Sequence, residues 1–269
     1  MALDPSSVLL TDRVAVVTGG GSGIGRGIAA GLTAFGARVA IWERNPDTCA
    51  AAADEIGALG IPTDVRDSAA VDAALAQTVK ELGTVSILVN NAGGVFWSGI
   101  LDTSENGWDA LYKSNLRHVY LCTQRVARTL VEQKLPGSVI SVTSIEGVRA
   151  APGYATYAAA KAGVINYTKT AALELAPHGI RVNALAPDIT WTEGLEQIAP
   201  PGSRERMGFT VPMGRAGHVD EMAGAAVFLA SDMSSYITGQ TIHVDGGTHA
   251  ASGWYHNAET GAYALGPTN

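Results

Sequence analysis

Tyr157 and Lys161 are the residues whose types and spacing most clearly predict chemistry. Residues four apart lie on one face of a helix, so the lysine ammonium would lie beside the phenol. At about 4 Å and an effective dielectric near 20, the attraction between ammonium and phenolate is roughly 4 kcal/mol. That would lower the tyrosine pKa from about 10 to about 7. A pKa near the working pH suits a general acid or base, so the pair predicts proton transfer.

A glycine-rich turn predicts a site for a phosphate-containing cofactor. The stretch Thr18-Gly-Gly-Gly-Ser-Gly-Ile-Gly25 follows an apolar run and opens a predicted helix. Glycines let the backbone approach a pyrophosphate, whose charge is favoured by a helix N-terminus. The strand–turn–helix context is the one that a dinucleotide motif requires. The predicted cofactor contacts in this turn are Gly19, Ser22, Gly23, Ile24 and Gly25.

Glu43 and Arg44 bear on the choice between NAD and NADP. A carboxylate at the end of the second predicted strand can accept hydrogen bonds from both hydroxyls of the adenosine ribose, and it would repel a 2′-phosphate. The Arg44 guanidinium could instead bind that phosphate, and either residue could be a solvated surface charge. We expect NAD to be preferred over NADP.

The bulk composition limits the class of protein. The chain has 269 residues, 46% hydrophobic and 16% charged, with a net charge of −7, which is typical of a globular protein with an ample core. The negative charge argues against nucleic acid or an anionic membrane as the main partner. Cys49 and Cys122 lack metal-site spacing, so no metal is expected. Neither a signal peptide nor an apolar run of about 18 residues is seen, and we expect a cytoplasmic protein.

Short apolar runs alternate with longer alanine-rich stretches, which predicts strands alternating with helices. This alternation predicts an α/β protein with a Rossmann-type, doubly wound, seven-stranded and mainly parallel sheet covered by helices on both faces. Pro62 suits only an edge strand. The predicted strands span residues 13–18, 38–42, 61–63, 86–90, 138–143, 181–186 and 241–244.

The predicted helices have recognisable starts and ends. Ser68 is the expected cap of the third, and Gly107 marks an expected break near the start of the fourth. We expect one domain over residues 1–269, with a small substrate lobe at 188–215 and an irregular tail at 250–269. The predicted helices span residues 24–35, 46–59, 68–82, 104–135, 157–176 and 219–230.

Taken together, the motifs resemble those of the short-chain dehydrogenase/reductase family, in its short form. The resemblance covers roughly residues 10 to 248 and is highly specific as a set. Its motifs stand here as Thr18-Gly-x-x-x-Gly-Ile-Gly25, Asn90-Asn-Ala-Gly93, Ser144, Tyr157-x-x-x-Lys161 and Val244-Asp-Gly-Gly247.

The resemblance implies a role for each catalytic candidate. Tyr157 would be the general acid in reduction and the general base in oxidation, and Ser144 would donate a hydrogen bond to the substrate oxygen. Lys161 would bind the hydroxyls of the nicotinamide ribose and lower the pKa of Tyr157. Asn115 would hold a water molecule in a proton relay.

The resemblance also implies cofactor contacts outside the glycine-rich turn. Asp64 would contact the adenine amino group, and Thr192 would reach the nicotinamide carboxamide. The segment Asn91, Ala92 and Gly93 would line the adenosine ribose. The other residues in the implied cofactor set are Val65, Pro187, Thr190, Tyr157 and Lys161.

The substrate wall is less defined by sequence. Asp188 departs from the family pattern, which has glycine after the proline, so it is either a tolerated loop change or a contact to a polar substrate. Trp191 could pack a substrate or only the lobe, and Glu146 could select a polar or cationic substrate or face water. The substrate candidates are Val95, Phe96, Ile145, Glu146, Tyr154, Asp188, Trp191 and Leu195.

These patterns favour an oxidoreductase that transfers a hydride between a nicotinamide cofactor and a secondary alcohol or ketone, and no metal is implied. The alternatives are an NADPH-dependent 3-oxoacyl thioester reductase and a non-catalytic dinucleotide-binding sensor. The chain is too short for the longer sugar epimerases, and enoyl reductases of the superfamily space their Tyr and Lys more widely. The resemblance implies a homotetramer, in which residues 253–256 either cover a neighbour's site or dock on their own chain.

Overall fold

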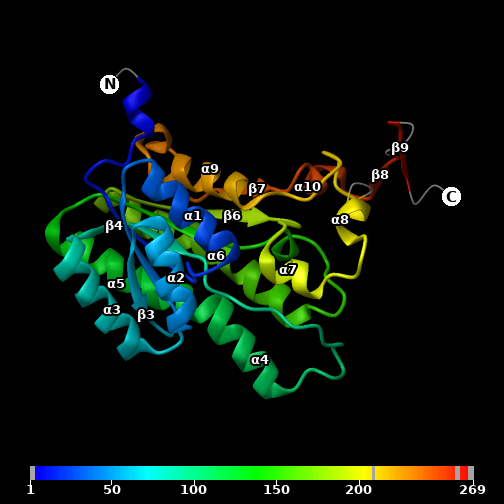
Figure 1. The fold of residues 1–269 in the computed structure, drawn as a ribbon, viewed down its shortest axis with the longest axis horizontal. Coiled ribbons are helices and arrows are strands. Elements are labelled where there is room, and N and C mark those ends of the chain that lie inside the picture. The colour runs from blue at the N-terminus through cyan, green and yellow to red at the C-terminus, as the bar shows by residue number, and fades with distance from the viewer. Residues whose placement is uncertain (1–3, 208–209, 258–260, 266–269) are drawn as a thin grey trace.

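Seven parallel strands form the sheet at the centre of the molecule (Figure 1). The computed structural model describes residues 4–207, 210–257 and 261–265. The strand order is β3-β2-β1-β4-β5-β6-β7, and every pairing is parallel, which confirms the predicted fold class. The strands are β1 (Val14–Thr18), β2 (Arg38–Glu43), β3 (Leu59–Pro62), β4 (Val85–Asn90), β5 (Gly137–Val142), β6 (Ile180–Pro187) and β7 (Thr241–Val244).

Helices cover both faces of this sheet because alternate strand residues point to opposite sides. Ala15 and Val17 of β1 pack in a core with α1, α2 and α9, whereas Val14 and Val16 pack in a core with α3, α5 and α6. Strands buried on both faces read as continuous apolar runs, as β1 does. The longer helices are α1 (Gly23–Ala34), α2 (Pro46–Ile56), α3 (Ser68–Leu82), α4 (Glu105–Tyr112), α5 (His118–Gln133), α6 (Ala155–Leu175) and α9 (Val219–Ala230).

The strand order reverses between β1 and β4, and the carboxyl ends of these two strands are fastened together. Asn91, just after β4, donates from Nδ2 to the carbonyl oxygens of Thr18 and Gly19, both at 3.0 Å. The Thr18 Oγ1 accepts from the amides of Asn91 and Ala92, also at 3.0 Å. A crevice at such a reversal is where open α/β sheets bind ligands, so these bonds set the geometry of that crevice.

Several predicted helix ends need correction. Asp67 caps α3 in place of Ser68, because its carboxylate accepts from the Ala69 amide at 2.9 Å. The second helix ends at Ile56 because Gly57 adopts φ 72°, a left-handed conformation that terminates helices. Leu59 consequently belongs to β3, which does lie at the sheet edge as Pro62 requires.

The long fourth helix is interrupted at a different place from the one predicted. Gly107 lies within the first turn of α4, where its amide donates to Ser104 Oγ at 3.1 Å. The irregularity is a π-helical turn at Lys113–Arg117, which separates α4 from α5. Such turns are common at functional sites, and this one contains Asn115.

The segments after β6 and β7 are more ordered than predicted. The lobe after Pro187 contains α7 (Glu193–Ile198) and α8 (Ser203–Arg206). The tail contains α10 (Thr248–Ala251) and an antiparallel pair, β8 (Trp254–His256) and β9 (Tyr263–Leu265), so the expectation of an irregular tail was wrong. Figure 1 shows this pair projecting from the body beyond α8.

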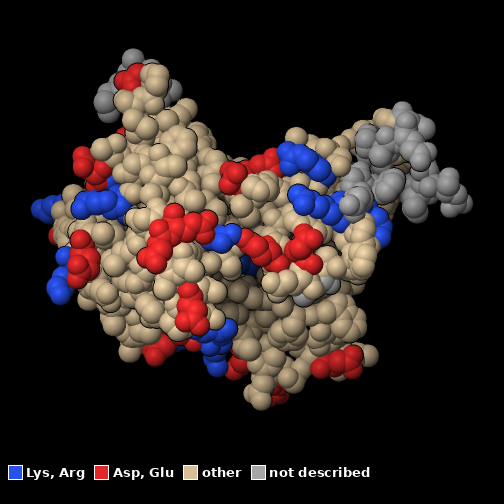
Figure 2. Space-filling view, viewed as in Figure 1, with Lys and Arg blue, Asp and Glu red and all other residues tan. Residues whose placement is uncertain are grey.

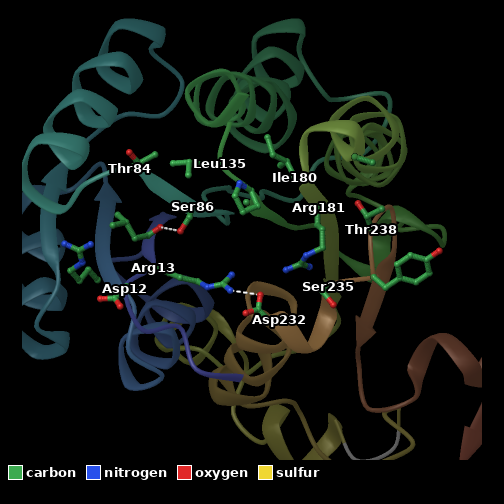
Figure 3. Close-up of a pocket in the computed structure, with 17 residues that line it drawn as sticks. Asp12, Arg13, Thr84, Ser86, Leu135, Ile180, Arg181, Asp232, Ser235 and Thr238 are labelled. Atoms are coloured by element: carbon green, nitrogen blue, oxygen red, sulfur yellow. Dashed lines mark hydrogen bonds and ion pairs between the residues drawn. The ribbon is translucent and has the colours of Figure 1, made fainter. Parts of the chain in front are cut away.

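At the amino ends of the strands, two arginines hold the end of α9 against the sheet (Figure 3). Arg13 donates to the Ala230 carbonyl at 3.1 Å and pairs with Asp232 at 2.6 Å. Arg181 donates to the Ser231 carbonyl at 3.2 Å, and its burial lowers its pKa to about 10. Arg13, Arg181 and Asp232 border a cavity of about 940 Å³. This cavity lies at the amino ends of the strands, whereas the crevice lies at their carboxyl ends.

Charged side chains of both signs are interspersed over the described part of the face drawn in Figure 2. Among the described residues, no helix combines the length and the apolar character that crossing a bilayer demands.

Gly25 tests how tightly the glycine-rich turn is packed. A Cβ at this position would overlap the Gly19 carbonyl oxygen, whereas a Cβ at Gly224 in α9 meets nothing within 4 Å. We expect Gly25→Ala to lower the free energy of unfolding by about 1–3 kcal/mol, as overpacking does. The matched Gly224→Ala should raise it by up to about 1 kcal/mol. Urea unfolding checks both values, and equal effects would contradict the packing described.

Candidate active site

The glycine-rich turn forms one wall of the crevice. Gly19 and Gly23 have φ of 62° and 53°, conformations that L-residues with side chains rarely adopt. A Cβ on Gly23 would lie 3.3 Å from the Thr192 methyl carbon, so the predicted nicotinamide contact Thr192 does lie beside the turn. The amide groups at the start of α1 suit the negative charge of a pyrophosphate.

A second wall contains the residues predicted at the adenosine end. Glu43, Arg44, Asp64, Val65 and Gly93 line one cavity of about 360 Å³, and Figure 2 shows the molecular surface recessed near the centre of the view. This volume and its mixed charges suit an adenosine group. The carboxylate of Glu43 already accepts from the Asn45 amide at 3.0 Å through Oε1.

Asp64 is bound to a residue that sequence reasoning missed. Arg66 donates to both carboxylate oxygens, from Nε to Oδ1 at 2.9 Å and from Nη2 to Oδ2 at 2.5 Å. This hydrogen-bonded pair lowers the pKa of Asp64. Arg66 therefore orients the carboxylate predicted to contact adenine, and it adds a second cation beside Arg44 in the same cavity.

Ser144 and Tyr157 come together at the carboxyl end of β5. Ser144 caps a 3-10 turn, Ile145–Gly147, with its Oγ accepting from the Glu146 amide at 3.1 Å. Accepting this bond does not use the Ser144 hydroxyl proton, which can be donated to Tyr157 or to a substrate oxygen. Burial raises the pKa of Tyr157; a hydrogen bond with Ser144 opposes the rise and the negative charge of Glu146 adds to it.

Lys161 is fully buried one turn along α6 from Tyr157. Its Nζ donates to the Val142 carbonyl at 2.9 Å and lies 5.5 Å from the centre of the Tyr157 ring. Burial lowers the pKa of Lys161 to about 8. The predicted pairing of the two residues on one helix face is seen. The predicted lowering of the Tyr157 pKa is not, because desolvation of the phenol raises its pKa by more than the hydrogen bond with Ser144 lowers it.

Asn115 sits in the π-helical turn with its side chain fully buried. Its Nδ2 donates to the carbonyl oxygens of Gly94 at 2.8 Å and Leu111 at 3.0 Å. These bonds join the turn to the loop after β4. His118, one turn further along α5, is also fully buried, and its pKa falls to about 3 through burial and the nearby Lys161 charge. No motif or periodic pattern in the sequence marks His118.

Three charged side chains form a cluster beside Ser144. Arg149, another residue that sequence reasoning missed, donates from Nη2 to Glu146 Oε1 at 2.8 Å and to Asp188 Oδ1 at 3.2 Å. Burial raises the pKa of Asp188, and the Arg149 charge opposes that rise. The predicted substrate candidates Glu146 and Asp188 are therefore partners in one ionic network, which we call the Glu146–Arg149–Asp188 cluster.

The lobe residues have partners of their own. Trp191 donates from Nε1 to Glu196, and the Arg204 guanidinium lies 5.5 Å from the centre of the Trp191 ring. These contacts agree with the expectation that Trp191 packs the lobe. Thr190 pairs with Gly217 in an isolated parallel bridge. Leu195 donates its amide to Thr192 Oγ1 at 3.2 Å, which places it at the start of α7.

The remaining wall candidates divide between surface and core. Val95, Phe96 and Tyr154 are exposed, as a substrate-facing wall requires. Ile145 is a correction: its side chain is only 1% exposed and belongs to the core, because the 3-10 turn directs it inward. Within the described residues, no group of three or more His, Cys, Asp or Glu side chains is arranged to hold a metal ion.

Comparison with known proteins agrees with this geometry. A family model described as enoyl-(acyl carrier protein) reductase matches residues 19–249. The 3-oxoacyl-[acyl-carrier-protein] reductase FabG of Chlamydia muridarum is 38% identical over 248 residues, covering 89% of this chain and 98% of that protein. The chain belongs to the short-chain dehydrogenase/reductase family. It is thus an NAD(P)-dependent oxidoreductase that acts on carbonyl or CH–OH groups.

Solved structures of family members match the fold of this chain over most of its length. A short-chain dehydrogenase/reductase from Mycobacterium marinum has a TM-score of 0.85 and 35% identity, covering 90% of this chain and 98% of that one. A 7α-hydroxysteroid dehydrogenase complexed with NADH and 7-oxo glycochenodeoxycholic acid has a TM-score of 0.86 and 28% identity, covering 91% and 98%. The names of these relatives give different substrates, a 3-oxoacyl-[acyl-carrier-protein] in one and 7-oxo glycochenodeoxycholic acid in another. The similarity therefore does not identify the substrate of this chain.

The burial of Lys161 predicts a pH-dependent stability difference. Its pKa in the folded protein, about 8, lies below the ordinary 10.5, so its contribution to stability falls as pH falls from 10.5 through 8. We expect Lys161→Met to gain stability over the wild type as pH is lowered from about 9.5 to about 7, by about 2 kcal/mol. Urea unfolding at both pH values measures this difference.

Lys169→Met is the matched control, because Lys169 is exposed on the same helix. Its stability relative to the wild type should not change over this pH range. An equal pH response in the two variants would contradict the assignment of a charged, desolvated Lys161.

Proposed function

We propose that this enzyme oxidises a secondary alcohol, or reduces the matching ketone, with Tyr157 as the proton-transfer residue. The observation that carries the proposal is the meeting of Ser144, Tyr157 and Lys161 at the carboxyl end of β5. The glycine-rich turn at the end of β1 lies in the same crevice. A proton donor or acceptor is thereby placed beside a cofactor site.

The residues of the crevice fit a nicotinamide dinucleotide. The Gly19–Gly25 turn would hold the pyrophosphate, and a Cβ at Gly25 would distort this turn by overlapping the Gly19 carbonyl oxygen. The Glu43 cavity would hold adenosine. Thr190, Thr192 and Pro187, at and after the end of β6, would border the nicotinamide. When bound, the nicotinamide supplies or accepts the hydride, because the redox chemistry belongs to the cofactor.

The side chains supply position and protons. Ser144 would donate a hydrogen bond from its hydroxyl group to the substrate oxygen, and this bond would polarise the substrate carbonyl. Tyr157 gives a proton to that oxygen in reduction and takes one in oxidation. Lys161 would bind the hydroxyls of the nicotinamide ribose, and its charge would favour the phenolate of Tyr157 when the two lie close. The hydrogen bonds of Asn115 fix the π-helical turn, which contacts the helix that carries Lys161. The carbonyl group of Asn115 would hold the water of a proton relay.

NAD is the proposed cofactor because Glu43 lines the adenosine cavity, and its Oε2, which lies beside the turn, accepts no hydrogen bond from the described residues. Arg44 and Arg66 are the features that favour NADP, since guanidinium groups bind phosphate strongly. We expect NADH to bind at least about tenfold more tightly than NADPH, because like charges placed together cost several kcal/mol. Isothermal titration of the purified protein with each cofactor measures the ratio.

Glu43→Gln should narrow that ratio by weakening the repulsion of a 2′-phosphate. Tighter binding of NADPH to the wild type would show that Arg44 and Arg66 dominate. That result would favour the second candidate function, reduction of a 3-oxoacyl thioester, which the names of the relatives suggest.

The homotetramer and the cytoplasmic location stay predictions. Large apolar side chains exposed on the long helices support assembly, and they include Trp108, Tyr112, Tyr120 and Leu173. Trp254 and Tyr255 line a cavity with Arg149 and Asp188 of their own chain, which favours docking of the tail on its own subunit.

Tyr157→Phe tests the proposed catalysis. We expect turnover to fall at least about 100-fold, since general acid–base catalysis contributes about 10²–10⁴-fold, while NADH affinity changes little. Steady-state kinetics and cofactor titration on the same preparation separate these effects. Tyr167→Phe on the same helix is the control. Retained turnover in Tyr157→Phe would contradict the proposed role, and a parallel loss in the control would show a packing effect.

A further inference from the structure

The Glu146–Arg149–Asp188 cluster carries information about the substrate. Two carboxylates share one guanidinium, so the cluster holds an excess of one negative charge. It lies at the substrate side of the site, because the Glu146 amide donates to Ser144 Oγ at 3.1 Å. The Glu146 charge also reaches the Tyr157 phenol. A group on the carbon next to the reacting carbon would therefore face this cluster.

The hydrogen bonds within the cluster leave one acceptor unused. Arg149 binds Oε1 of Glu146, whereas Oε2 is buried and has no hydrogen-bond partner among the described residues. A buried carboxylate oxygen without a partner is costly. Asp188, by contrast, is bound by Arg149 and also by Thr248 and the Ile189 amide. Glu146 Oε2 is thus the atom of the cluster that calls for an incoming donor.

The position of Arg149 bears on which charge the cluster accepts on a substrate group. Its Nη2 is held between Glu146 and Asp188, at 2.8 Å and 3.2 Å, so this nitrogen is already occupied by the two carboxylates and their combined charge exceeds that of the guanidinium. An anionic group beside the reacting carbon would meet the excess negative charge, and an alkyl group would leave Oε2 unpaired. A hydroxyl or ammonium group would satisfy it.

A cavity lies against Arg149 and Asp188 of the cluster, on the side of the tail. This cavity of about 540 Å³ is bordered by Arg149, Asp188, Thr248, Trp254 and Tyr255. Its lining combines hydroxyl and charged groups with two aromatic side chains. A polar substrate larger than a simple alcohol has room to extend there.

We propose that Glu146 is a specificity-determining residue, selecting substrates with a hydrogen-bond donor on the carbon next to the reacting carbinol, foremost vicinal diols. The inference rests on the proposed function, since it assumes that Ser144 and Tyr157 bind the reacting oxygen. It also accounts for Asp188 at the position where the family has glycine. Asp188 helps to hold Arg149, which in turn orients Glu146.

A panel of ring alcohols tests the selection. The probes are cyclohexanol, cyclohexane-1,2-diol, 2-aminocyclohexanol and 2-hydroxycyclohexane-1-carboxylate, each oxidised with NAD and, separately, with NADP. We expect kcat/KM of the wild type to be at least about tenfold higher for the diol than for cyclohexanol, because a hydrogen bond to a charged acceptor is worth about that factor. The carboxylate should be the poorest substrate. A stronger preference for the amino alcohol would assign ammonium as the donor.

Glu146→Met removes the acceptor while keeping the length of the side chain. We expect the diol-to-cyclohexanol ratio of kcat/KM to fall at least about tenfold in this variant. Glu81→Met is the control, because Glu81 lies on α3 and pairs with exposed Lys80, and it should keep the wild-type ratio. Thermal unfolding and NADH titration confirm that each variant folds, and the wild-type ratio is a test that needs no variant.

The outcomes separate the two proposals. Oxidation of cyclohexanol as efficiently as the diol by the wild type, or an unchanged ratio in a folded Glu146→Met, would overturn the inference and leave the proposed function standing. Absence of oxidation of every probe with both cofactors would overturn the proposed function and the inference with it.

Discussion

The parallel register of the sheet is the constraint on which the site depends. Since every crossover returns the chain to the same edge, the carboxyl ends of β1, β4, β5 and β6 meet there. Segments far apart in the chain thus become neighbours: the glycine-rich turn, the Asn91 loop, Ser144 and Asp188. The bonds from Asn91 to the carbonyl oxygens of Thr18 and Gly19 join the ends of β1 and β4 and so set the geometry of the crevice.

Burial is the second constraint, and it works against stability. Lys161 is desolvated and Tyr157 is largely so, which lowers the pKa of the first and raises that of the second. A phenol held in its neutral form suits proton donation in reduction, and a nearby ammonium favours the phenolate required for oxidation. The fold tolerates the buried charge because Val142 supplies a carbonyl oxygen at 2.9 Å, so a structural cost is retained at the place where chemistry is proposed.

Much of this arrangement was predictable from the sequence, because its signals are local or belong to a dense set of motifs. The apolar runs placed all seven strands of the sheet, and the spacing of Tyr157 and Lys161 placed both on one helix face. The π-helical turn at Asn115 was not predictable, since no residue type there forbids an ordinary helix. Arg66 and Arg149 were missed for another reason: they pair with Asp64 and Glu146, two and three positions away, through loop conformations that no motif marks.

The errors have the same origin. Ile145 follows the catalytic candidate Ser144 in sequence, but a 3-10 turn directs it into the core. The tail lacks the alternation of a sheet strand, yet two three-residue segments within it, Trp254–His256 and Tyr263–Leu265, pair as β8 and β9. Short elements of this kind depend on the surface against which they lie, and periodicity over so few residues is uninformative.

The central claim is that a hydride passes between a carbinol carbon and the nicotinamide while the side chains handle the proton. The most direct test is oxidation of a secondary alcohol that carries deuterium on its carbinol carbon, followed by mass spectrometry of the reduced cofactor. The account predicts one deuterium on the nicotinamide ring for each alcohol oxidised. Reduced cofactor without deuterium would show that the hydride does not come from that carbon and would contradict the account.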